Sequence, residues 1–140
     1  MKVLRNLLAV VAGLVVGGAV NMALIIASPL VIPPPAGVNV SDPQSLSASM
    51  HLFEPKHFVF PFLAHALGTL VGALVAFLIA ASHKPVFAFV IGACFLAGGI
   101  AAARMIPAPT GFVVLDHAAA YVPMAFLATL LGRRITGPKP

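Results

Sequence analysis

The sequence predicts an all-α integral membrane protein, a four-helix transmembrane bundle with a short amphipathic helix on the outer side between spans 1 and 2. Apolar residues make up 61% of the 140 residues and charged residues only 8%, whereas a soluble domain carries roughly 25% charged residues. Four apolar runs are long enough to cross a bilayer, which takes about 20 residues of helix. Residues 1–140 therefore form a single membrane domain.

The first span is predicted at about residues 7–32. It follows Lys2 and Arg5 and ends before Pro33–Pro35, because proline lacks a backbone donor and clashes with the preceding helical turn. A signal peptide is the competing interpretation, since Gly17–Ala19 offers small residues for cleavage after a short apolar core. The apolar run continues well beyond these residues, which favours a full span.

The outer loop, residues 33–57, contains the predicted short helix. Either Ser41 and Gln44 form a capping box, or Asp42 is the N-cap with Pro43 in the first helical position. We expect a helix from about Pro43 to Phe53, ended by Pro55. Its apolar residues form one narrow stripe, typical of a helix that lies in the interface or across the bundle mouth: Leu46, Met50 and Phe53.

The remaining spans are predicted at about residues 58–82, 86–105 and 112–131. The turn between the second and third spans is short, so these two helices should be antiparallel neighbours. Pro123 lies inside the fourth span, where a proline removes a helical hydrogen bond. We therefore expect a kink there.

The basic residues predict the orientation of the bundle. Basic residues gather on the cytoplasmic side of membrane proteins. One end of the predicted spans carries Lys2, Arg5, Lys84, Arg133, Arg134 and Lys139, against Lys56 and Arg104 at the other end. We expect a multi-pass protein of the cell (inner) membrane with both termini in the cytoplasm. The outer side then holds all three acids and most of the histidines.

Unusual polar residues form a layer beneath the outer surface. Asn21 lies ~21 Å along the first span and His65 ~10 Å into the second, at ~1.5 Å per residue, and these depths converge. The predicted polar layer comprises Asn21, His65, Thr69, Arg104, Asp116, His117 and Tyr121. We expect Arg104 and Asp116 to pair across the outer turn, because an unpaired charge in a bilayer is costly. A ligand-binding role for the layer is the alternative.

Two cofactor hypotheses follow from the histidines. His51, Glu54 and His57 are suitable ligands for zinc or another divalent ion, although Pro55 separates the first two residues from the third. His65 and His117 lie at one depth on different spans, as a haem with two histidine ligands requires. The sequence does not decide whether either cofactor is bound.

Glycine pairs predict close helix packing. The first and second spans each contain two glycines four residues apart, a spacing that lets helix backbones approach closely in membranes: Gly13, Gly17, Gly68 and Gly72. The four spans enclose little volume, which favours either self-association or docking on a larger membrane complex.

Two functions are compatible with these features. The first is a non-enzymatic membrane protein, either an oligomeric conduit or transporter of a small solute or an accessory subunit, with the polar layer as its site. The second is a membrane enzyme or electron carrier with a metal or haem on the outer side. The sequence has no phosphate-binding or nucleophile motif. Its dispersed basic residues exclude nucleic acid as a partner, and the lipid bilayer is the expected one.

Overall fold

A computed structural model describes residues 1–137 and confirms the all-helical bundle, with four segments long and apolar enough to span a membrane. These segments are α1 (Lys2–Val31), α3 (Val59–Ile79) with the short turn before it, α4 (Lys84–Met105), and the fourth span, which is divided into α5 (Thr110–Ala119) and α6 (Val122–Thr136). Several helices extend beyond the predicted apolar runs into charged termini, because Lys and Arg are good helix formers. Lys139, one of the bases used to predict orientation, lies outside the described residues.

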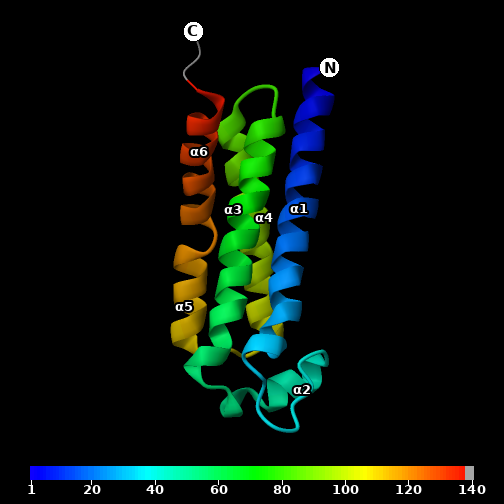
Figure 1. Ribbon diagram of the computed structural model, residues 1–140, viewed down its shortest axis with the longest axis vertical. Coiled ribbons are helices and arrows are strands. Elements are labelled where there is room, and N and C mark those ends of the chain that lie inside the picture. The colour runs from blue at the N-terminus through cyan, green and yellow to red at the C-terminus, as the bar shows by residue number, and fades with distance from the viewer. Residues whose placement is uncertain (138–140) are drawn as a thin grey trace.

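The spans run alternately up and down, and the start of α1 and the end of α6 lie at the same end of the bundle (Figure 1). α3 is the central helix: it packs against α1 on one side, against α6 on the other, and against α4. The outer loop with α2 lies at the end opposite the termini. The arrangement places the predicted outer side and the predicted cytoplasmic side at opposite ends of one bundle.

The closest helix contact joins α1 and α3 through their glycines. A Cβ atom added to Gly17 would lie 2.6 Å from the carbonyl oxygen of Gly68, and one added to Gly13 would lie 2.7 Å from that of Gly72. Real side chains do not approach backbone this closely, so both helices need glycine at these positions. The two predicted glycine pairs therefore face each other within one chain.

Polar contacts fix the end of the bundle that holds the termini. The Asn6 side chain accepts a hydrogen bond from the backbone N–H of Ala81 at 2.8 Å and donates one to Ser82 Oγ at 3.1 Å. Arg5 Nε donates to the carbonyl oxygen of Ile79 at 2.7 Å. These bonds satisfy backbone groups that the end of α3 leaves unpaired and attach the start of α1 to the α3–α4 turn.

The outer helix is shorter than predicted. α2 spans Pro43–Ala48 and is capped by Asp42, whose carboxylate accepts from two backbone N–H groups of the first turn. The chain then tightens into two 3₁₀ turns, η1 (Met50–Leu52) and η2 (Pro55–Phe58), so the expectation of one helix to Phe53 was wrong. Serine is a weaker helix former than alanine or leucine, and Ser45 Oγ accepts a hydrogen bond from the backbone N–H of Asn39 at 3.1 Å.

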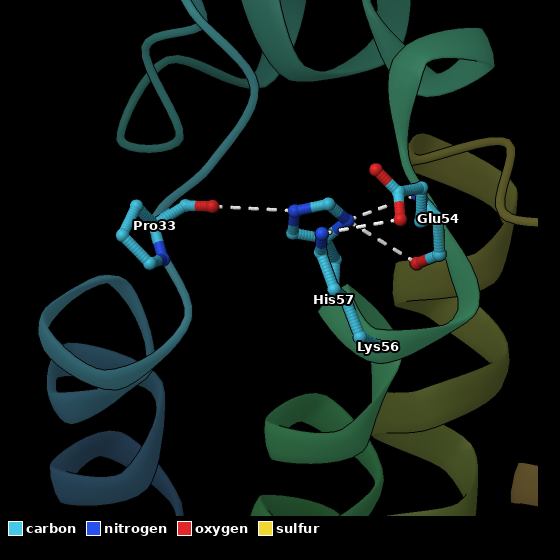
Figure 2. A network of polar contacts seen from close by, with 4 residues as sticks. All are labelled: Pro33, Glu54, Lys56 and His57. Carbon is cyan, nitrogen blue, oxygen red and sulfur yellow. Dashed lines mark hydrogen bonds and ion pairs between the residues drawn. The ribbon is translucent and has the colours of Figure 1, made fainter.

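His57 fastens the outer loop to the bundle (Figure 2). Its Nδ1 accepts a hydrogen bond from the backbone N–H of Glu54 at 2.9 Å, so the ring proton resides on Nε2, which lies 3.2 Å from the carbonyl oxygen of Pro33. The buried ring therefore joins the exit of α1 to the entrance of α3.

The fourth span breaks where a kink was expected. α5 ends at Ala119 and α6 begins at Val122, with Pro123 in its first turn. Pro123 has no N–H to donate to the carbonyl oxygen of Ala119, and its ring would clash with that carbonyl in a continuous helix. The break lies at the depth of the predicted polar layer.

Candidate functional site

The centre of the polar layer is Asp116, a buried acid on α5 that is 3% exposed. One carboxylate oxygen, Oδ1, lies 2.8 Å from Nδ1 of His65 on α3. The other, Oδ2, accepts a hydrogen bond from the Tyr121 hydroxyl at 2.7 Å. The carboxylate thus joins the second and fourth spans.

The helix break positions Tyr121 against this carboxylate. Tyr121 follows the end of α5, and its ring stacks on that of His65 with centroids 5.8 Å apart. On the facing helix α4, the space that a side chain would need at Gly99 is filled by the Tyr121 hydroxyl. Glycine at position 99 therefore lets the hydroxyl reach Asp116.

The hydrogen bonds of His65 and of His117 indicate which ring nitrogen of each carries a proton. An ionised carboxylate can only accept, so Nδ1 of His65 donates to Asp116 and Nε2 is left for another partner. Nδ1 of His117 lies 2.6 Å from the carbonyl oxygen of Val113, which also can only accept. In the neutral form of His117, Nε2 is therefore an acceptor.

Three buried polar atoms of the layer have no hydrogen-bond partner within residues 1–137. They are Nε2 of His117, Oδ1 of Asn21 and Oγ1 of Thr69. Buried polar groups are nearly always paired, and an exception calls for a water, an ion or a ligand. These atoms line or adjoin the space around His65.

Two cavities meet at His65. One, of about 300 Å³, lies beneath the outer loop, and its polar lining includes His65, Asp116 and His117. The other, of about 340 Å³, includes Asn21 on α1 and Tyr121 in its lining. The residues that line both cavities are His65, Gly99 and Ala102. His65 can therefore be reached from either cavity.

The predicted ion pair between Arg104 and Asp116 was wrong. Arg104 lies exposed in the last turn of α4, and no ion pair involves it in the described part of the chain. Asp116 lies about six residues into α5, or ~9 Å below its start, and faces α3. The difference in depth and in helix face separates the two charges.

The outer loop does not gather the predicted metal ligands. His51 is exposed, Glu54 pairs with Lys56 at 3.1 Å, and both ring nitrogens of His57 bond backbone groups (Figure 2). No group of three His, Cys, Asp or Glu side chains that could hold a metal occurs between Met1 and Gly137. Of the three, only His57 lines the cavity beneath the loop, and it joins the loop to the bundle.

No protein-family model, curated protein or solved structure matches the chain. The function is therefore inferred from the geometry of the site. The predicted polar layer included His65, Asp116 and Tyr121, which the structure brings together, and Arg104, which lies exposed and apart from them. The His65–Asp116 contact and the cavity were not predicted. One sequence feature could have indicated the position of the site: Pro123, which breaks the fourth span next to Tyr121.

Proposed function

We propose that this protein is a small multi-pass membrane transporter that binds its solute at the site formed by His65, Asp116 and Tyr121. The observation that carries the proposal is the buried carboxylate of Asp116 beside a cavity. An acid within a membrane span is costly, at about 2.5–3.5 kcal/mol at the helix centre, and such residues commonly mark solute or proton pathways. Four apolar helices can span a membrane without such an acid.

The broken fourth span supports the same proposal. Transporters often build their solute sites where a spanning helix is discontinuous, because the unwound backbone lines a cavity and can contact the solute. Here the break between Ala119 and Val122 brings Tyr121 onto Asp116. The broken helix and the carboxylate thus belong to one site.

The contact between His65 and Asp116 supports a role for protons. Chains of Asp and His carry protons in membrane pumps and transporters, and this pair is connected at 2.8 Å. With the termini in the cytoplasm, as the basic residues predict, the site would open to the outer side. A proton and a solute would then reach His65 from the same cavity.

Transport can be tested on reconstituted protein without knowing the solute. Capacitive currents are recorded from proteoliposomes on a solid support after rapid jumps of small cationic, anionic and neutral solutes. At least one class should give a current with the native protein and none with Asp116→Asn. The control is Glu54→Gln, which makes the same change of charge on the exposed outer loop. Equal currents from all three proteins, or no current from any, would contradict the proposal.

One observation favours a second candidate, an electron carrier or enzyme with a metal or haem. Metal-bound histidines usually donate their other ring N–H to a carboxylate or a backbone carbonyl. His65 and His117 both show this arrangement, through Asp116 and Val113. Absorbance spectra and metal analysis of gently purified protein test it: a Soret band or stoichiometric metal would support this candidate, and a colourless, metal-free protein would eliminate it.

A further inference from the structure

The polar groups around the cavity indicate which kind of solute it fits, if the proposed transport function holds. In the tautomers set by the structure, neutral His117 offers an acceptor at Nε2, Asn21 offers its carbonyl oxygen, and the Asp116 carboxylate can only accept. The Nε2 atom of His117 and the Oδ1 atom of Asn21 are thus buried acceptors without a donor among residues 1–137. A solute that supplies N–H or O–H groups would satisfy them.

The charge of the site also indicates which kind of solute it fits. Asp116 is the only acid in the four spans, and no Lys or Arg lines either cavity. The titratable groups that face or share these cavities with His65 are Asp116, Tyr121, His117, His57 and Cys94. A positive charge on the solute can therefore balance the negative charge of Asp116 within the site.

The rest of the cavity beneath the outer loop suits the apolar part of a solute. Its wall beneath the outer loop includes the aromatic rings of Phe53, Phe58 and Phe112, and aromatic faces attract cations as well as apolar groups. The volume of about 300 Å³ lies at the lower end of the ~300–1,000 Å³ typical of small-molecule pockets. The polar groups gather at His65 and Asp116, which defines a charged end and an apolar end.

We propose that the cavity binds an amphipathic organic cation, a protonated amine with an apolar body. Its ammonium group supplies the positive charge beside Asp116 that no Lys or Arg supplies in the lining of the cavity. In a medium of low dielectric, a carboxylate favours a solute of opposite charge over a neutral or anionic one.

The test uses three matched probes on purified protein in detergent: 4-phenylbutylamine, 4-phenylbutan-1-ol and 4-phenylbutyrate, which are cationic, neutral and anionic. Calorimetry should show binding of the amine at least tenfold tighter than that of the other two. Asp116→Asn should weaken amine binding at least tenfold, and Glu54→Gln should leave it unchanged. Equal binding of amine and alcohol, or unchanged binding to Asp116→Asn, would overturn the proposal.

The same probes separate the two proposals. If the anion or the alcohol binds and drives current while the amine does neither, the transport function stands and the assignment of an organic cation is wrong. If the amine binds more tightly than the other two probes but drives no current, the ligand class stands and the transport function is wrong.

Discussion

Tyr121 and Gly99 share one small space between the fourth span and α4. The Tyr121 hydroxyl lies where a side chain of residue 99 would begin, and from there it donates to Asp116. The neighbouring Gly98 has open space around it. These adjacent glycines differ in what surrounds them, so they form a matched pair for testing the site.

Gly99→Ala should displace the Tyr121 hydroxyl from Asp116. The expected cost is about 1–3 kcal/mol in the free energy of unfolding, from overpacking and from the lost hydrogen bond. Gly98→Ala should be neutral or stabilise by up to about 1 kcal/mol, because alanine is the better helix former. Unfolding by SDS titration in mixed micelles measures both. A similar effect of the two substitutions would contradict the placement of Tyr121.

Tyr121→Phe should remove the hydrogen bond to Oδ2 of Asp116 while keeping the ring stacked on His65. Single polar contacts between membrane helices contribute on average about 0.6 kcal/mol, so we expect a loss of stability of that order. The same SDS titration measures it. No change in stability would mean that the hydroxyl does not bond to Asp116 in the membrane protein.

At the scale of elements, the contact between α1 and α3 depends on glycine from both helices. Gly17 lies against the backbone of Gly68, while the adjacent Gly18 has no neighbouring atom within 4 Å of an added Cβ. Gly17→Ala should therefore cost about 1–3 kcal/mol by forcing the helices apart. Gly18→Ala should have no such cost. Equal melting temperatures for the two variants would contradict this helix contact.

The sequence was enough to predict the helices of this bundle but not which faces meet. Each span is a long apolar run, so its existence and approximate limits follow from composition and length alone. Because the runs are apolar on nearly all sides, they carry little signal of which face points inward. Asp116 and Arg104 are close in sequence, and their separation depends on helix rotation and depth. The contact of Asp116 with His65 is set by packing across the bundle.

At the scale of the whole molecule, α3 packs against α1 on one side and α6 on the other, and the start of α1 and the end of α6 lie at one end (Figure 1). The basic residues at that end predict a cytoplasmic location. In a Cys94→Ala background, Ser41→Cys on the outer loop should react with an impermeant thiol reagent in intact cells. Thr136→Cys near the end of α6 should react only after lysis. The reverse labelling would contradict the orientation.

The most direct test of the site is a double-mutant cycle across α3 and α5. His65→Ala, Asp116→Ala and the double variant are compared with the native protein by the free energy of unfolding. A direct contact should give a coupling energy of about 0.5–2 kcal/mol, whereas the same cycle with Arg104→Ala and Asp116→Ala should give additive effects. Additivity for His65 and Asp116, or strong coupling of Arg104 to Asp116, would contradict the site described above.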